Sequence, residues 1–178
     1  MRPQQFGDYT VRKLVEVVEP FKPEFAFKAF DANVLADHAD WLAPHFVDQS
    51  ADGLVMPFSF HTYVVQAQGK TILIDTCIGN HKDRAALPFW DMQNRPYIDN
   101  LYAMGIAPEE VDYVMCTHLH ADHVGWNTRL IDGRWVPTFP NARYVFAETE
   151  FGFWSELNKK GAKYSDGCID DSVLPVVE

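Results

Sequence analysis

Cys116-Thr117-His118-Leu119-His120-Ala121-Asp122-His123 is the stretch of this sequence that best predicts its fold. It holds three of the seven histidines of the chain and follows the run Val111-Asp112-Tyr113-Val114-Met115. A short, mostly apolar and partly β-branched run of this kind is typical of a buried strand. We therefore expect four side chains with metal-binding chemistry to gather where a strand ends.

The spacing within this stretch predicts two pairs of metal ligands. Side chains at i and i+2 of a strand point the same way, so His118 and His120 can converge on one ion. Asp122 and His123 follow the strand and can turn toward a second ion. Imidazole and carboxylate groups suit Zn²⁺ or a similar first-row metal, and Asp122 could also orient or deprotonate a bound water as the catalytic residue. The alternative is a solvated charged loop, but burying these groups without a metal would leave polar atoms unpaired.

His118-Leu119-His120-Ala121-Asp122-His123 resembles the HxHxDH signature of the metallo-β-lactamase superfamily, and Gly125 stands where that motif often carries glycine. The resemblance implies an α/β fold of the αββα sandwich type and a site for two zinc ions. The wider segment from Thr117 to Thr128 resembles the bacterial hydrolase branch that includes lactonases and related esterases. The motif is specific for the superfamily, and it leaves the reaction open.

A second segment, Asp75-Thr76-Cys77, resembles the Asp-Thr-Gly segment of the same superfamily, with cysteine where glycine is common. The resemblance implies that Asp75 supports the ligand loops without binding metal, by accepting hydrogen bonds from loop N–H groups or ligand histidines. A simple Asx-turn is the alternative interpretation. Trp126 and Asn127 are close enough to the motif to line a substrate pocket, although Trp126 could equally be a packing residue. Among the other histidines, His38 and His45 are expected at the surface, and His61 is expected to be a core or hydrogen-bonded histidine.

The rest of the chain alternates between strand and helix patterns, as expected when helices cover a sheet. The expected strands are residues 9–18, ended by Pro20, then 58–65 and 71–75 as an antiparallel hairpin, 128–131 and 134–136 as a second hairpin, and 142–147. The expected helices are 33–44, 96–104 and 148–157, with Phe151, Phe153 and Trp154 on the core-facing side of the last. Residues 48–53 are expected to form a polar loop.

Composition limits the class of protein. A chain of 178 residues with 47% hydrophobic residues suits one globular domain spanning residues 1–178. The formal net charge is −10, which argues against nucleic acid as a partner, because such partners require basic surface. Three cysteines without CxxC spacing indicate a reducing compartment. The sequence shows no apolar leader and no apolar run near the ~20 residues of a membrane span, so we expect a cytoplasmic protein with no membrane partner.

The predicted ligand set is smaller than the one that the resemblance implies. A zinc site normally has at least three protein ligands, and each predicted pair supplies two. In the family, a third histidine, a bridging aspartate and a last histidine come later, and no histidine follows His123 here. Three explanations are open: a piece of a longer enzyme without the C-terminal half of the sandwich, ligands from another polypeptide, or a degenerate family member. We favour the first, and expect a homo-oligomer or a further C-terminal segment to complete the site.

The leading hypothesis is a metal-dependent hydrolase that uses a metal-activated water on a lactone, an ester or a related carbonyl compound, with a small-molecule substrate. The alternative is a non-catalytic metal-binding or interaction domain that kept the fold. A nuclease with the same motif is a third hypothesis, which the acidic charge disfavours.

Overall fold

The computed structural model describes residues 2–43, 45–50, 53–162 and 167–177. The chain forms two compact units, which are residues 1–16 together with 61–178, and residues 17–60. Compactness alone does not define an independent domain, so a single domain over residues 1–178 stays a prediction. Over the described ranges, no helix is long and apolar enough to cross a membrane.

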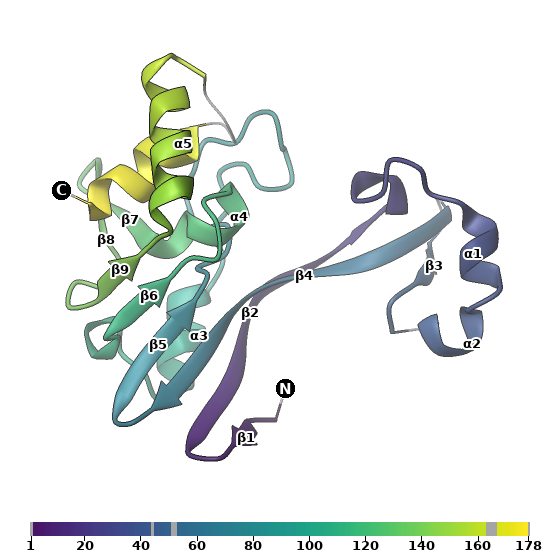
Figure 1. Cartoon of the computed structure of the whole chain (residues 1–178), viewed down its shortest axis with the longest axis horizontal. Helices are drawn as coiled ribbons and strands as arrows, with labels where there is room; N and C mark the ends of the chain where they lie inside the picture. Colours follow the sequence, from purple (N-terminus) through teal and green to yellow (C-terminus); the bar gives the residue numbers. More distant parts are fainter. Residues whose placement is uncertain (1, 44, 51–52, 163–166, 178) are drawn as a thin grey trace. The chain divides into compact units, whose positions relative to one another are not determined.

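The strands form one large sheet and one separate hairpin (Figure 1). The order in the large sheet is β1-β2-β4-β5-β6-β9, and β3 pairs with β4. β7 and β8 form the antiparallel hairpin. The strands are β1 Gln4–Phe6, β2 Tyr9–Phe21, β3 Asp48–Ser50, β4 Gly53–Ala67, β5 Lys70–Ile74, β6 Tyr113–Met115, β7 Thr128–Ile131, β8 Arg134–Pro137 and β9 Arg143–Val145. The expected strands and both expected hairpins are therefore present.

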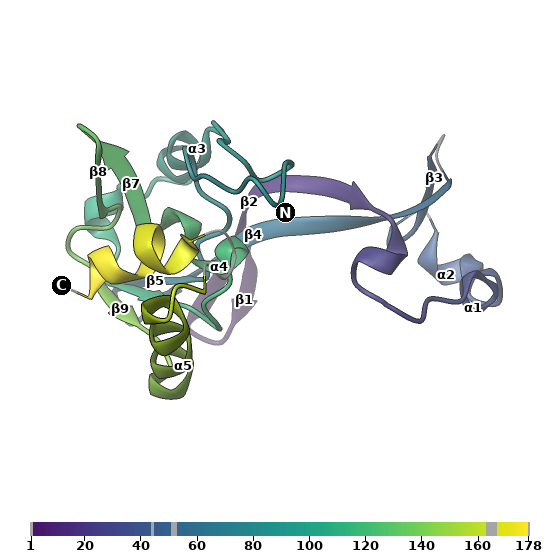
Figure 2. The same ribbon diagram turned by 90° about the horizontal axis from the view of Figure 1, so that it is seen from above.

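Short helices connect and cover these strands. In the larger unit, α3 and α5 lie on opposite sides of the large sheet (Figure 2). The α-helices are α1 Ala32–Ala36, α2 Ala39–Leu42, α3 Tyr97–Ala103, α4 Ala121–Val124 and α5 Glu148–Lys159. Single turns of 3-10 or π helix occur at Pro23–Phe25, Pro108–Glu110, Gly125–Asn127, Ile169–Val173 and Leu174–Val176.

The sheet of the larger unit is held by a row of buried side chains across its strands. Val64 of β4 lies opposite Leu73 of β5, which lies opposite Val114 of β6, and all three are fully buried. From α3, Tyr97 and Leu101 are also fully buried. Burying a side chain of this size stabilises the fold by roughly 1.5–3 kcal/mol. This row fixes the register of β5 and β6, whose ends carry the predicted site.

A buried ionic cluster joins two distant segments of the larger unit. Arg84 and Lys82 are fully buried, and Arg84 makes a bidentate pair with Asp171, with Nη1–Oδ2 and Nη2–Oδ1 distances of 2.7 and 2.9 Å. Lys82 Nζ donates to Thr128 Oγ1 at 2.6 Å and lies 3.5 Å from the centre of the Trp135 ring. Burial lowers the pKa of Lys82 to about 7, despite the opposing charge of Asp171. Two cations therefore share one carboxylate.

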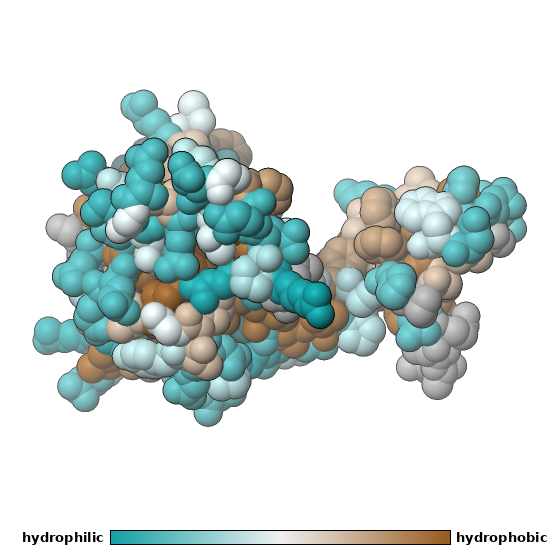
Figure 3. Space-filling view, turned by 90° about the horizontal axis from the view of Figure 1, so that it is seen from below, coloured by the Kyte–Doolittle hydropathy of each residue, from teal (hydrophilic) through white to brown (hydrophobic). Residues whose placement is uncertain are grey.

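The smaller unit contains a cluster of aromatic side chains. The Phe21 and Phe25 rings stack with centroids 4.4 Å apart, and Phe58 meets both of them edge-on. A hollow of about 320 Å³ within this unit is lined mainly by apolar residues, namely Phe27, Ala29, Phe30, Asp31, Val34, Leu35 and Met56. Figure 3 shows hydrophobic side chains, in brown, scattered among hydrophilic ones on the surface.

Four expectations from the sequence were wrong in detail. The helix over 33–44 is two helices, because the chain breaks at Asp37 and His38, while the expected stop at Pro44 lies outside the described residues. Strand β2 continues through Pro20 to Phe21, and the loop over 48–53 includes β3. In α5, where every residue is described, none is buried, and Phe153 is 58% exposed. The periodicity of the sequence predicted the helix correctly, but it did not predict which of its side chains are buried.

Candidate metal site

The predicted site lies at one edge of the large sheet. β5 and β6 are parallel, and Ile74 is paired with Met115, so Asp75 and Cys116 begin two neighbouring loops. The backbone N–H of Asp75 donates to Met115 O at 3.0 Å. Figure 1 shows α4 beyond the end of β6. In parallel sheets, ligands bind beyond the carboxyl ends of the strands, and the motif occupies this position.

The three histidines of the motif gather where the loop after β6 enters α4, with His123 inside that helix. β6 ends at Met115, so His118 and His120 follow the strand rather than lie on it, and His120 is the N-cap of α4. The His118 ring centre is 4.4 Å from that of His120 and 3.8 Å from that of His123. The convergence expected from the spacing is present, although a loop produces it.

Asp122 and His123 have a separation that suits a shared ion. His123 Nε2 lies 3.3 Å from Asp122 Oδ2. Two ligands at about 2.0–2.2 Å from a tetrahedral Zn²⁺ lie ~3.4 Å apart, so this spacing fits the pair. Over the described part of the chain, however, no group of three or more His, Cys, Asp or Glu side chains is arranged to hold a metal ion. The structure thus brings Asp122 and His123 together as a pair, and their binding of zinc stays a prediction.

Asp75 holds both ends of the motif loop. Its Oδ1 accepts from the backbone N–H of Thr117 at 2.7 Å, and its Oδ2 accepts from the Thr117 hydroxyl at 2.8 Å. Its Oδ2 also lies 2.8 Å from His123 Nδ1. A carboxylate on Nδ1 leaves Nε2 directed at Asp122, which is the arrangement that orients a metal-binding histidine. These are hydrogen bonds of the kind that the resemblance implies for Asp75, and its supporting role at a metal site stays a prediction.

The surroundings of the motif residues shift the pKa values of its histidines in opposite directions. Burial and the neighbouring His123 lower the pKa of His118, which favours a neutral imidazole. Burial acts against the charge on His123, but hydrogen bonds with Asp122 and Asp75 outweigh it and raise its pKa to about 9. Burial likewise opposes ionisation of Asp122, yet the contact with His123 lowers its pKa. Burial also opposes ionisation of Asp75, yet its hydrogen bond with His123 lowers its pKa, so both carboxylates are ionised. His123 must lose its proton before it can bind a metal.

The loop after β5 packs directly against α4 through two glycines. A Cβ at Gly125 would lie 1.8 Å from Ile78 O, and one at Gly79 would lie 2.7 Å from the Gly125 backbone. Three hydrogen bonds join the segments: Thr76 N to His123 O, Gly125 N to Cys77 O and Trp126 N to Thr76 O, at 2.7–2.8 Å. Cys77 has a φ of +51°, the left-handed conformation that glycine adopts most easily. Cys77 thus holds a conformation that glycine would adopt with less strain.

Glu16 is a site-supporting residue that sequence reasoning missed. It lies in β2 and accepts hydrogen bonds from the backbone N–H of Ile78 at 2.8 Å, from that of Gly79 at 3.2 Å and from Trp126 Nε1 at 2.7 Å. Burial raises its pKa, against the hydrogen bond from Ile78. The available signal was a carboxylate between the apolar pairs Leu14-Val15 and Val17-Val18 of β2, because such a group needs buried donors.

Trp126 and Asn127 are interior side chains. Trp126 is 5% exposed and stacks on Tyr97, with ring centroids 4.9 Å apart. Asn127 is fully buried and its Oδ1 accepts from the Thr76 hydroxyl at 2.8 Å. These contacts give both residues a packing role, and their place in a substrate pocket stays a prediction.

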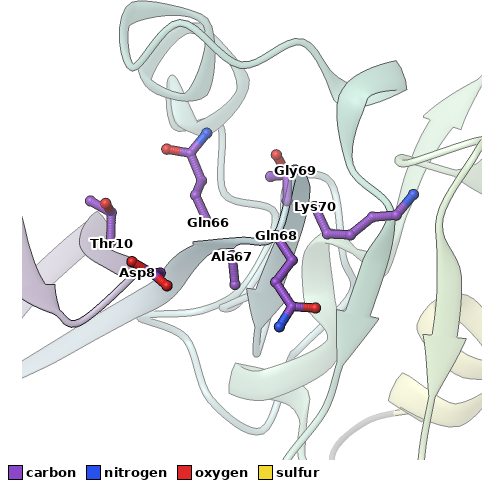
Figure 4. Close-up of a pocket in the computed structure, with 8 residues that line it drawn as sticks. Asp8, Thr10, Gln66, Ala67, Gln68, Gly69 and Lys70 are labelled. Atoms are coloured by element: carbon purple, nitrogen blue, oxygen red, sulfur yellow. The ribbon is translucent and has the colours of Figure 1, made fainter.

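A polar pocket of about 350 Å³ lies at the other end of β5 (Figure 4). The turn into β2 contributes Asp8, and the β4–β5 hairpin contributes Gln66, Gln68 and Lys70. Lys70 already forms an ion pair with Asp112 at 2.6 Å. No cluster of histidine or carboxylate ligands faces this pocket among its lining residues, which are all described. The candidate metal ligands are therefore at the Asp75 end of β5.

The fold and the motif together define an α/β protein with a paired histidine–carboxylate loop at a sheet edge. The profile of the metallo-beta-lactamase superfamily matches residues 57–177, and the chain belongs to that superfamily. It is 26% identical over 134 residues to the N-acyl homoserine lactonase AiiB of Agrobacterium fabrum, an alignment that covers 68% of this chain and 44% of AiiB.

Two solved structures have a similar fold. The hydrolase AbOPH of the beta lactamase superfamily has a TM-score of 0.69 at 27% identity, over 97% of this chain and 56% of that one. The dizinc quorum-quenching lactonase AidC has a TM-score of 0.60 at 16% identity, over 96% of this chain and 59% of that one. The αββα metallo-β-lactamase fold expected from the motif is thereby confirmed. The chain spans about half the length of these relatives.

Proposed function

We propose that the protein acts as a zinc-dependent hydrolase of lactones or carboxylic esters, in the form that contains its full set of ligands. Membership of the metallo-beta-lactamase superfamily supports metal-dependent hydrolysis as the class of activity. The similarity to N-acyl homoserine lactonases supports the substrate class. The observation that carries the proposal is the Asp75–His123–Asp122 chain, in which one imidazole is fixed between two carboxylates.

In this proposal, His118 and His120 hold one zinc ion, and Asp122 and His123 hold the second. When bound there, zinc supplies a water that is reactive near neutral pH and a Lewis acid for the substrate carbonyl. Asp75 keeps Nε2 of His123 pointed at the site. Asp122 orients the attacking water, takes its proton and passes that proton to the leaving alkoxide, so that the acid and the alcohol are released.

The test is a screen of lactones and esters with the protein and its His120→Ala variant, each supplied with Zn²⁺. We expect hydrolysis by the protein and none by the variant. A matched control is His61→Ala, since His61 is in β4 and outside the motif. Equal hydrolysis by the protein and His120→Ala would contradict the proposal.

The second candidate is a non-catalytic metal-binding domain, which is favoured by the two-ligand pairs. It predicts that His118→Ala weakens Zn²⁺ binding while no substrate in the screen is hydrolysed, even by the longest form of the protein that can be purified.

A further inference from the structure

Helix α5 supplies a carboxylate to the middle of the motif loop. Glu150, in the first turn of α5, accepts a hydrogen bond from the backbone N–H of Leu119 on its Oε1, at 3.1 Å. Leu119 separates His118 from His120 in sequence, and its side chain is fully buried. The contact therefore fixes the main chain between the two histidines predicted to share one ion.

The same carboxylate oxygen links this loop to an aromatic side chain beside the site. Trp154 Nε1 donates to Glu150 Oε1 at 2.7 Å, one turn further along α5. The Trp154 ring meets the His120 ring edge-on, with centroids 5.8 Å apart. Trp154 thus orients Glu150 through a hydrogen bond and contacts His120 directly. The three groups form a continuous connection from α5 to the motif.

Asp75 and Glu150 hold different parts of the motif loop. Asp75 contacts Thr117 and His123, which are the two ends of the loop, whereas Glu150 contacts Leu119 at its centre. Asp75 comes from the loop after β5, and Glu150 comes from a helix that begins well after the motif. The second carboxylate therefore adds a hydrogen bond at the centre of a segment that Asp75 contacts at both ends.

We propose that Glu150 is a positioning residue for the predicted metal ligands, because it fixes the backbone between His118 and His120 while Trp154 fixes Glu150. This inference rests on the proposed function for its consequence, which is tighter metal binding. The hydrogen bond from Leu119 to Glu150 belongs to the chain itself, so its effect on the loop is measurable without metal. Hydrogen-bonding partners behind metal ligands typically change metal affinity 10–100-fold when they are removed.

The test compares Glu150→Ala with Glu150→Gln, which keeps the acceptor oxygen, and with Glu156→Ala, an exposed glutamate on the same helix. Amide hydrogen exchange across residues 116–124 is measured first, without metal. We expect the Leu119 amide to exchange at least ~10-fold faster in Glu150→Ala and unchanged in the other two. Unchanged exchange in Glu150→Ala would overturn the inference. If Glu150→Ala does not fold, Trp154→Phe, which removes the donor and keeps an aromatic ring, replaces it with the same expectation.

Co²⁺ affinity, measured by competition with a chelator, and the visible spectrum of bound Co²⁺ complete the test. We expect affinity to fall ~10–100-fold and the spectrum to change in Glu150→Ala, with Glu150→Gln close to the original protein. Faster exchange with unchanged Co²⁺ affinity would overturn the positioning role. A third outcome separates the two proposals. If the original protein binds no Co²⁺ but the Leu119 amide still exchanges faster in Glu150→Ala, the proposed function is contradicted. The conclusion that Glu150 fixes the loop is then supported.

Discussion

Asp75 and Asp171 are two carboxylates of the same unit that pair with positively charged or protonatable side chains in different ways. Asp171 has the guanidinium of Arg84 as its main partner, and both Arg84 and Lys82 are fully buried. Asp75 has an imidazole partner, His123, whose side chain is 26% exposed and whose second nitrogen faces another carboxylate. An arginine guanidinium uses two N–H groups to bind both oxygens of one carboxylate. A histidine that pairs through one ring nitrogen keeps the other nitrogen for a ligand. Similar ionic chemistry thus joins distant segments in one place and orients a predicted metal ligand in the other.

The largest effect expected is from Asp171→Asn. The substitution leaves two buried cations without a carboxylate, and breaking a buried pair in this way costs roughly 3–5 kcal/mol of unfolding free energy. Denaturant unfolding measures it. Asp170→Asn, at the neighbouring exposed position, is the control and is expected to change little. Similar losses in both variants would show that the cluster does not stabilise the fold.

Gly125→Ala is expected to have the next largest effect. The new Cβ would lie 1.8 Å from Ile78 O, so the loop after β5 must move away from α4. Overpacking of this kind costs about 1–3 kcal/mol. Gly152→Ala is the matched control in α5, where a Cβ meets nothing within 4 Å, and it should stabilise the protein by roughly 0.5–1 kcal/mol. Thermal unfolding of the pair distinguishes the two sites, and equal melting temperatures would contradict the packing described.

Asp75→Asn should separate ligand orientation from stability. We expect Zn²⁺ affinity to fall ~10–100-fold, because the amide holds the His123 imidazole less firmly than a carboxylate does. The unfolding free energy should change by less than about 2 kcal/mol, since Asn can still accept from the Thr117 N–H. Zinc competition assays and denaturant unfolding check the two values. A loss of unfolding free energy without a loss of Zn²⁺ affinity would mean that Asp75, like Asp171, serves stability rather than ligand orientation.

The smallest effect expected is a pH dependence of stability from Lys82. Its folded pKa of about 7 is below the usual 10.5, so between these values the unfolded chain binds a proton that the folded chain does not. Stability contributed by this group therefore rises with pH across that window. Unfolding at pH 7 and pH 9 should show a smaller rise in Lys82→Met than in the original protein. An identical pH dependence would contradict the lowered pKa of Lys82.

The motif itself could be predicted from sequence because its ligands are neighbours in the chain. The convergence of His118, His120 and His123 follows from a six-residue spacing and a preceding strand. Asp75 was reached only through the resemblance to a family segment, since no local pattern joins it to His123. The strands were predicted because their alternation and turn residues are local properties.

Glu16 and Glu150 could not be predicted, because their partners are remote in sequence. Glu16 contacts Trp126 across 110 positions, and Glu150 contacts Leu119 across 31. A single sequence shows a carboxylate in a strand or a helix but not the N–H groups that face it. The exposure of Phe153 on α5 was missed for a related reason, since periodicity does not say what covers a face.

Calorimetric titration of the protein with Zn²⁺, beside the double variant His120→Ala/His123→Ala, tests the metal site most directly. Each substitution removes one ligand from one predicted ion. We predict saturable Zn²⁺ binding by the protein and loss of that binding in the double variant, with both remaining folded by circular dichroism. Equal binding in the two proteins, or no binding in either, would contradict a metal site formed by His118, His120, Asp122 and His123.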